Sequence, residues 1–304
     1  ISTFGFWLEQ LIAESTGKEG KGILPVEGEP LGDPSVYGDD RLFIYLRTET
    51  GYDQAQDAAI EQLKSAGQPT VQLQIEDTYD LGTEFFRWEF ATAIAGAFLG
   101  INAFDQPNVQ ESKDNTDRIL KEYAQTKVMA APRAVLQTQS RNVSLVATGD
   151  LAQRLRQSVS LQAAMEMIAQ LADPGDYIAL LAYVERTPET HNALQAVRLR
   201  LRDMRRVATT LGYGPRFQHS TGQEHKGGPN TGVFLQFVAT DTADVPIPNE
   251  AYTFSILKQA QALGDLQSLE AHQRRVVRID LGTDIVSGLG EVLQALEAAV
   301  IQEA

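Results

Sequence analysis

The sequence of 304 residues contains no cysteine. This absence excludes a disulfide framework, a thiolate metal site and a cysteine nucleophile, and it makes a reducing cytoplasm the expected location. Basic residues are scarce, since 26 lysines and arginines stand against 40 acidic residues and leave a net charge of −14. Such a charge repels nucleic acid and anionic membranes, so we expect neither as a partner.

Long apolar runs are missing as well. No stretch approaches 18 uncharged apolar residues, and no basic segment followed by an apolar one opens the chain. We therefore expect neither a membrane span nor a targeting peptide. Because 43% of the residues are hydrophobic, the chain can still bury a core of enzyme size, as one large α/β unit or as two domains.

One segment is locally basic, and it contains Arg198, Arg200, Arg202, Arg205 and Arg206. Apolar residues spaced three and four apart lie between these arginines, from Leu194 to Leu211, which is the pattern of a helix with one buried face. We expect a helix over residues 188–211 with its arginines on a solvated or interface face. Its heptad-like apolar side offers a homodimer contact.

Strand and helix patterns alternate along the chain, which favours an α/β fold with a parallel sheet covered on both faces. The predicted strands cover residues 42–46, 71–75, 177–184, 233–238 and 276–281. The predicted helices include residues 53–65, 81–99 and 151–171, of which 81–99 is apolar enough to be nearly buried. Residues 130–148 lack a clear helical period, so we place the boundary between domains 1–129 and 130–304 there.

Three segments combine glycine with polar residues and are candidates for chemistry. The first, Glu14 to Gly22, places a carboxylate near Lys18 and Lys21, as a general base facing an anionic substrate would require. A charged helix terminus with glycine caps would look the same. The second, Phe104 to Lys113, puts a lysine in the first turns of a helix, either on the surface or against a ligand oxygen.

The third segment, Gly212 to Asn230, holds two of the four histidines, His219 and His225. Histidine titrates near neutral pH and can transfer protons. Zinc binding is the rival interpretation, but a third ligand at motif spacing is missing, so we expect no metal.

The same segments resemble phosphoglucose isomerase, the glucose-6-phosphate isomerase family. Residues 7–18 read WLEQLIAESTGK and look like the family's signature around its catalytic glutamate, and residues 100–113 read GINAFDQPNVQESK and look like its late signature, which ends on a catalytic lysine. Residues 218–228 and the unusual order of the segments resemble the isomerase half of bifunctional transaldolase/phosphoglucose isomerases.

The resemblance implies a three-layer αβα sandwich of the sugar-isomerase (SIS) type, with residues 1–129 as the SIS-like domain that carries the glutamate and lysine motifs. It implies interconversion of glucose 6-phosphate and fructose 6-phosphate through a cis-enediol, with a sugar-phosphate substrate and no cofactor. Glu14 takes the place of the base, while Lys113 and a histidine, His219 in preference to His225, take the places of the residues that assist ring opening. Implied substrate contacts are Gln10, Ser15, Gly17, Lys18, Gln223, His225 and Lys226.

Two features depart from the family pattern. Residues 15–112 contain no histidine, although the family places its histidine between the glutamate and the lysine. The family's phosphate loop and the arginine that stabilises the enediolate have no counterpart here. We therefore expect this chain to be the carboxyl-terminal part of a larger enzyme with upstream SIS and transaldolase domains. The alternative is a sugar-phosphate-binding regulatory domain without catalysis.

Overall fold

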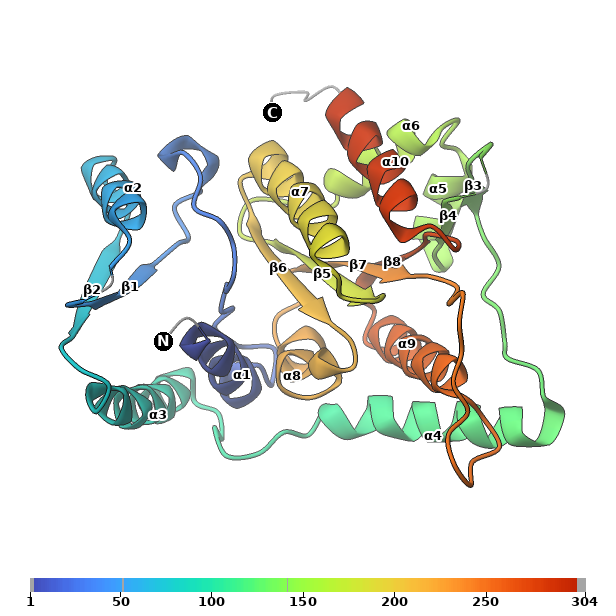
Figure 1. Ribbon diagram of the computed structural model, residues 1–304, viewed down its shortest axis with the longest axis horizontal. Coiled ribbons are helices and arrows are strands. Elements are labelled where there is room, and N and C mark those ends of the chain that lie inside the picture. Colours follow the sequence, from blue (N-terminus) through green and yellow to red (C-terminus); the bar gives the residue numbers. More distant parts are fainter. Residues whose placement is uncertain (1–2, 51, 141, 300–304) are drawn as a thin grey trace.

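In this computed structural model, the described residues are 3–50, 52–140 and 142–299. The outermost parts of both predicted domains, residues 1–2 and 300–304, lie outside them. A six-stranded sheet forms the centre of the molecule, with strand order β3-β4-β8-β7-β5-β6 (Figure 1). Its strands are β3 (Leu136–Gln137), β4 (Ser144–Val146), β5 (Tyr177–Tyr183), β6 (Ala208–Tyr213), β7 (Gly232–Val238) and β8 (Arg275–Asp280).

Four of these strands run parallel, in the spatial order β8-β7-β5-β6, while β4 pairs antiparallel with β8 and β3 antiparallel with β4. Every residue of β5 and β7 is buried, as expected for central parallel strands that are covered on both faces. The predicted α/β class with a mainly parallel sheet is confirmed.

Helices cover both faces of this sheet (Figure 1). One face packs in a single core against α5 (Gly149–Arg156), α6 (Leu161–Ala169), α7 (Pro188–Arg205) and α10 (Ile285–Ala298). The other face is covered by α4 (Val109–Thr126) and α9 (Phe254–Ala271), with the short helices η2 (Arg216–Gln218) and α8 (Ser220–Gly227) beside them. The result is a three-layer αβα arrangement.

The amino-terminal part adds a βαβ unit, as the sequence predicts. Its strands β1 (Phe43–Thr48) and β2 (Thr70–Ile75) pair in parallel, and they are connected by α2 (Gln54–Ser65). The remaining amino-terminal elements are α1 (Phe4–Thr16), η1 (Pro34–Val36) and α3 (Asp80–Leu99). Helix α1 packs on α8, and α4 packs along α9, so elements from before and after residue 130 share surfaces. The division into 1–129 and 130–304 stays a prediction.

The predicted single helix over 151–171 is wrong, because the chain breaks into α5 and α6. Ser160 adopts an extended backbone between them, and its side chain accepts a hydrogen bond from the backbone nitrogen of Ala163 at 3.1 Å. This is a serine N-cap that starts a new helix.

The predicted helix over 188–211 is too long. Helix α7 ends at Arg205, because Arg206 takes a left-handed conformation, with φ of 56°. The following residues, from Ala208, form strand β6 against β5. The apolar residues of β6 happen to continue the three-and-four spacing of α7, so this spacing did not indicate where the helix ends. The apolar side of α7, including Leu194 and Leu201, packs inside the chain's own core, so it is not the dimer contact we expected.

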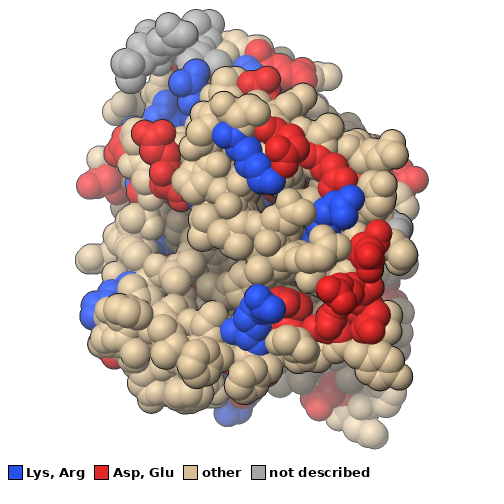
Figure 2. Space-filling view, turned by 90° about the vertical axis from the view of Figure 1, so that its left-hand side faces the viewer, with Lys and Arg blue, Asp and Glu red and all other residues tan. Residues whose placement is uncertain are grey.

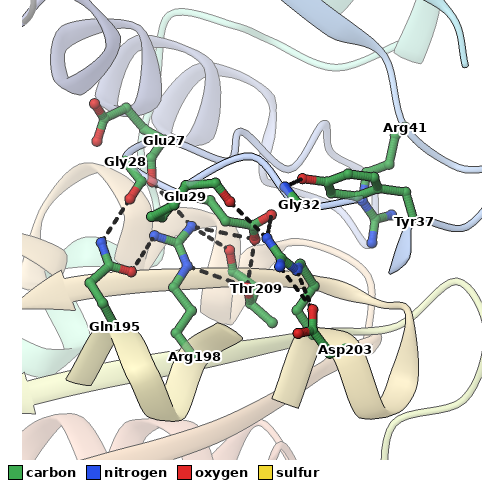
Figure 3. A network of polar contacts seen from close by, with 12 residues as sticks. Glu27, Gly28, Glu29, Gly32, Tyr37, Arg41, Gln195, Arg198, Asp203 and Thr209 are labelled. Atoms are coloured by element: carbon green, nitrogen blue, oxygen red, sulfur yellow. Dashed lines mark hydrogen bonds and ion pairs between the residues drawn. The ribbon is translucent and has the colours of Figure 1, made fainter. Parts of the chain in front are cut away.

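The expectation that the arginines of α7 are solvated is wrong for Arg198 and Arg202, which are buried. Glu29 binds both, with its carboxylate oxygens 3.8 Å from Arg198 and 3.3 Å from Arg202 (Figure 3). Thr209 of β6 donates to Glu29 at 2.7 Å, and Arg198 donates to the backbone oxygen of Glu27 at 3.1 Å. The two arginines therefore fasten the segment that follows α1 onto the central sheet.

The expected burial of the 81–99 helix is also wrong. Helix α3 contacts α1 on one side, where Phe85 packs on Trp7 at 4.5 Å between ring centroids. Its opposite side, with Phe86, Phe90 and Phe98, is exposed, because α3 lies at an outer edge of the molecule (Figure 1).

Candidate active site

The loop after α1 is a tight turn on the surface of α8. Gly17 ends the helix by donating to the backbone oxygen of Ala13 at 3.0 Å. Lys18 and Lys21 then exchange two backbone hydrogen bonds of 3.0 Å, with Glu19 and Gly20 between them at positive φ. A two-residue turn of this kind needs residues that tolerate the left-handed region, which explains a glycine here.

Position 17 also requires a glycine, because helix α8 approaches it closely. A β carbon on Gly17 would overlap the backbone of Glu224 in α8. The backbone nitrogen of Gly20 also donates to the oxygen of Gly227 at the end of α8, at 2.8 Å. The glutamate-bearing helix α1 therefore docks through its loop directly on the helix that follows His219.

Gln223 joins all three candidate segments. Its side-chain nitrogen donates to the backbone oxygen of Gly17 and to Oδ1 of Asn108, each at 2.8 Å. Its side-chain oxygen accepts from the backbone nitrogen of Asn108 at 2.8 Å. Because Gln223 is fully buried, these bonds form away from competing water.

The three predicted catalytic residues stand close in sequence to this junction. Glu14 precedes Gly17 by three residues, Lys113 follows Asn108 by five and His219 precedes Gln223 by four. Along a helix those separations correspond to roughly one to one and a half turns. Glu14 is half-buried, whereas Lys113 and His219 are exposed. The structure thus holds the three segments together at Gln223. The side chains of Lys113 and His219 are exposed to solvent.

The predicted substrate contacts divide into two groups. Ser15 and Gln10 are half-buried on α1, and the Gln10 amide, with its oxygen turned toward Arg216, accepts from Nε at 2.7 Å. The second group, like Gly17, is buried, and its side chains form polar contacts with other protein groups or pack against them. They are Lys18, Gln223, His225 and Lys226.

The buried members hold α8 in place rather than face an open cleft. Lys226 pairs with Asp265 of α9 at 2.7 Å, and both side chains are buried. His225 packs against the rings of Tyr177 and Phe234, at centroid distances of 6.4 and 5.1 Å. Burial lowers the pKa of His225 to about 3, with Lys226 adding to the effect, so this imidazole is neutral at physiological pH. Their contact with substrate stays a prediction that this burial does not favour.

Three cations of the candidate segments have protein partners. Buried Lys18 donates to the backbone oxygen of Asp105 and to its Oδ1 at 3.0 Å. Lys21 donates to the backbone oxygen of Leu99 at 2.7 Å. Arg216 donates to the oxygen of Phe6 at 2.6 Å and pairs with Glu9 at 3.2 Å.

Two buried carboxyl groups escaped the sequence analysis. Glu9 and Glu224 line a small cavity of about 20 Å³ between α1, β6 and α8. Burial raises the pKa of Glu9 to about 7 and that of Glu224 to about 8, against the opposing charges of Arg216 and Arg274. The cavity holds roughly one water molecule, so it is no sugar-phosphate site. The sequence feature that could have drawn attention to these carboxyl groups is the glutamate inside the glycine-rich segment 220–228.

Within residues 3–50, 52–140 and 142–299, no group of three or more histidine and acidic side chains is placed to hold a metal ion. Across the same residues, each helix is either too short or too polar to traverse a bilayer.

No protein-family model matches the chain. Curated relatives named glucose-6-phosphate isomerase match part of it. The protein from Lactobacillus helveticus is 28% identical over 151 residues, 38% of this chain and 34% of that protein. The relative from Leptospira biflexa is 28% identical over 157 residues, 39% of this chain and 35% of that protein. The relative from Streptococcus pyogenes is 29% identical over 156 residues, 40% of this chain and 35% of that protein.

Among solved structures, a hypothetical protein from Thermus thermophilus matches 96% of this chain and 75% of its own, at 13% identity and a TM-score of 0.39. The matched part spans about a third of the length of the curated relatives. The chain is thus distantly related to proteins named glucose-6-phosphate isomerase.

Proposed function

We propose that this chain contributes the acid–base residues of an aldose–ketose isomerase that interconverts glucose 6-phosphate and fructose 6-phosphate. The observation that carries the proposal is the junction at Gln223, which ties Gly17 and Asn108 to α8. Three segments that resemble one family's active-site motifs are thereby anchored at one place. Distant relatives named for the same reaction support the proposal.

In the proposed reaction Glu14 is the base. Its carboxylate removes the proton from the carbon beside the carbonyl of the open-chain sugar phosphate and returns it to the neighbouring carbon. Exposed Lys113 and His219 assist opening of the sugar ring, in which a proton moves from the anomeric hydroxyl to the ring oxygen.

The enediolate also needs a positive charge, and removing such a preorganised donor typically costs on the order of 10²–10³ in rate. Lys18, Lys21 and Arg216 each bind a protein group already. We therefore include in the proposal a cation from an upstream sugar-isomerase domain of the same polypeptide. The transaldolase fusion and a cytoplasmic location belong to the proposal as well.

The experiment uses the longer polypeptide of the proposal, with its upstream domain, and follows deuterium exchange into fructose 6-phosphate in D₂O by NMR. Glu14→Gln should lower the exchange rate by about 10²–10⁴, the usual contribution of a general base. Glu19→Gln is the matched control, since Glu19 is an exposed carboxylate in the same loop. Equal rates for Glu14→Gln and the wild type would refute the assignment of the base.

A second candidate is a sugar-phosphate-binding regulatory domain. The engagement of Lys18, Lys21 and Arg216 with protein groups favours it, because catalysis needs a cation beside the enediolate. This candidate predicts that calorimetry detects binding of fructose 6-phosphate while the deuterium exchange stays at the uncatalysed rate.

A further inference from the structure

Arg216 of η2 binds three residues of helix α1 through one guanidinium group. Its Nη2 donates to the backbone oxygen of Phe6 at 2.6 Å and lies 3.2 Å from Oε2 of Glu9. With the amide oxygen turned toward Arg216, Gln10 accepts from Nε at 2.7 Å and from Nη2 at 3.1 Å. The guanidinium carbon also lies 4.9 Å from the centre of the Phe6 ring. A single side chain thus joins η2 to α1.

The contact with Arg216 fixes how the Gln10 amide is turned. A guanidinium has donors and no acceptor, so the amide oxygen has to face it and the amide nitrogen takes the opposite branch. The terminal torsion of a glutamine is otherwise broad and roughly two-fold, so that either amide atom can be presented. Because Nε and Nη2 both hold the oxygen, Gln10 presents its nitrogen, a hydrogen-bond donor, on its other side.

That donor lies beside the proposed base. Gln10 precedes Glu14 by four residues on α1, so both side chains lie on one side of the helix, with β carbons roughly 5–6 Å apart. Both residues are half-buried, and neither is enclosed in the core. A ligand that reaches the Glu14 carboxylate therefore also reaches the Gln10 amide.

The segment that carries Arg216 is itself firmly held. Phe217 is buried and packs edge-on against Tyr183, with ring centroids 5.0 Å apart. Gln218 is buried as well and donates to the backbone oxygen of Gln261 at 2.8 Å. Arg216 therefore extends from a fixed base, and its hydrogen bonds impose a fixed geometry on the facing side of α1.

Recognition of an anionic substrate has little general charge to rely on. The chain has a net charge of −14, and on the face that Figure 2 shows, the lysine and arginine side chains lie scattered among acidic ones instead of forming one basic surface. Long-range attraction is therefore weak, and binding depends on individually placed donors. A donor whose direction is fixed before binding also avoids the entropy cost of ordering that side chain on binding.

We propose that Arg216 is a positioning residue of the isomerase, which holds the Gln10 amide so that its nitrogen donates to an oxygen of the sugar phosphate beside Glu14. This inference rests on the proposed function and adds Arg216 to it. Arg216 acts through Gln10, because its donors on the side of α1 bind protein oxygens. Without the guanidinium, the amide is free to turn its oxygen, an acceptor, toward the substrate.

The test uses the longer polypeptide of the proposed function and measures deuterium exchange into fructose 6-phosphate at varied substrate concentration. Arg216→Met should raise KM about tenfold, the equivalent of one misplaced hydrogen bond, and should change kcat less. Misfolding would instead remove active molecules, which lowers the apparent kcat and leaves KM unchanged. An unchanged KM for Arg216→Met would overturn the proposal.

Glu9→Gln is the matched control for this measurement. It removes the ion pair with Arg216 and keeps the contact between Arg216 and Gln10. Its KM should therefore stay within about twofold of the wild-type value. A tenfold rise in this control would assign the effect of Arg216→Met to the ion pair and overturn the proposal.

Combined substitutions show whether Arg216 acts through Gln10. Gln10→Met removes the amide and should raise KM by about as much as Arg216→Met does. The double variant should then have the KM of Gln10→Met alone, since the group that Arg216 orients is already gone. Effects that multiply to roughly a hundredfold would show two independent roles and contradict the proposal.

A measurement without substrate tests the contact itself. Nε of Arg216 donates to Gln10, whereas the contact with Glu9 uses Nη2. In protein with ¹⁵N-labelled arginine, the Nε–H of Arg216 should therefore exchange with solvent at least about tenfold faster in Gln10→Met than in the wild type or in Glu9→Gln. Equal exchange in the three proteins would overturn the proposal even for an active enzyme. If this N–H is protected but the wild type exchanges no deuterium into fructose 6-phosphate, the proposed function fails, and the role of Arg216 in orienting the substrate fails with it.

Discussion

The side-chain nitrogen of Gln223 lies 2.8 Å from the backbone oxygen of Gly17, although 206 residues separate the two positions. The same nitrogen lies 2.8 Å from Oδ1 of Asn108. Both donor hydrogens of one amide group are therefore used to connect the glutamate-bearing loop with the start of the lysine-bearing helix. A catalytic arrangement needs this kind of support, because reacting groups displaced by 1 Å lose much of their effect.

Gln223→Leu should destabilise the fold and disorganise the proposed site. It removes the partners of the Gly17 oxygen and of the Asn108 backbone nitrogen in a buried environment. Leaving two such groups unpaired costs on the order of 2–4 kcal/mol. Urea denaturation should report this loss, whereas Gln110→Leu, which removes an exposed amide from α4, should change stability by less than about 0.5 kcal/mol. If Gln223→Leu lowered the free energy of unfolding by as little as Gln110→Leu, the result would contradict the role that we give the junction.

The buried pair of Lys226 and Asp265 leads to a second prediction. Lys226→Met leaves the Asp265 carboxylate unpaired between α8, α9 and α4, and this should cost about 3–5 kcal/mol of unfolding free energy. Adding Asp265→Leu should recover much of the loss, because two apolar side chains then replace two desolvated charges.

The same denaturation measurements on the two single variants and the double variant give the coupling energy of the pair. Losses that simply add would show that the charges do not interact, contrary to the 2.7 Å distance.

Stability should fall as the pH rises, because of Glu224. Burial raises the pKa of its carboxyl from 4.5 to about 8, so between these values the native chain keeps a proton that the unfolded chain has lost. The native state is then favoured below pH 4.5, and this contribution disappears as the pH rises through 8. Glu9, with a pKa of about 7, acts in the same direction over a narrower range.

Glu224→Gln removes the ionisation while keeping the shape. The variant should match the wild type near pH 5 and exceed its stability near pH 8.5 by on the order of a few kcal/mol. Denaturation midpoints at the two pH values measure the difference. Glu185→Gln, which replaces an exposed carboxylate, should have the same effect on stability at both pH values. A pH-independent effect of Glu224→Gln would mean that this carboxyl is already ionised at about pH 5.

The alternation of strands and helices was readable from the sequence because apolar periodicity reports local structure directly. It located β1, α2 and β2 within one or two residues and identified three parallel strands of the central sheet, β5, β7 and β8, but it assigned the start of β6 to a helix. The predicted helix boundaries were wrong where the backbone of one residue interrupted a helix although the apolar pattern continued beyond it. The left-handed Arg206 ended α7, and the Ser160 cap separated α5 from α6.

Burial of charged residues could not be predicted, since it depends on partners that are distant in the chain. Arg198 and Arg202 look like a solvated stripe until Glu29, some 170 residues away, is placed against them. Lys226 looks like a ligand-binding lysine until Asp265 is known to face it. The prediction that residues 14, 113 and 219 share one site comes from the family resemblance alone, because nothing in their spacing indicates it.

His219 gives the last prediction, which separates ring opening from proton transfer at carbon. His219 is exposed directly before α8, within four residues of the junction at Gln223. If it assists only ring opening, His219→Ala should slow the turnover of cyclic glucose 6-phosphate by about 10²–10⁴, the usual contribution of a general acid or base. An open-chain analogue, which needs no ring opening, should react at nearly the wild-type rate. His191→Ala is the matched control, because His191 is a half-buried histidine of α7, on the opposite face of the sheet from α8, where its ring nitrogen lies 3.3 Å from the hydroxyl of Tyr213. Equal losses with the cyclic and open-chain substrates would assign His219 to the enediol step or to structure instead.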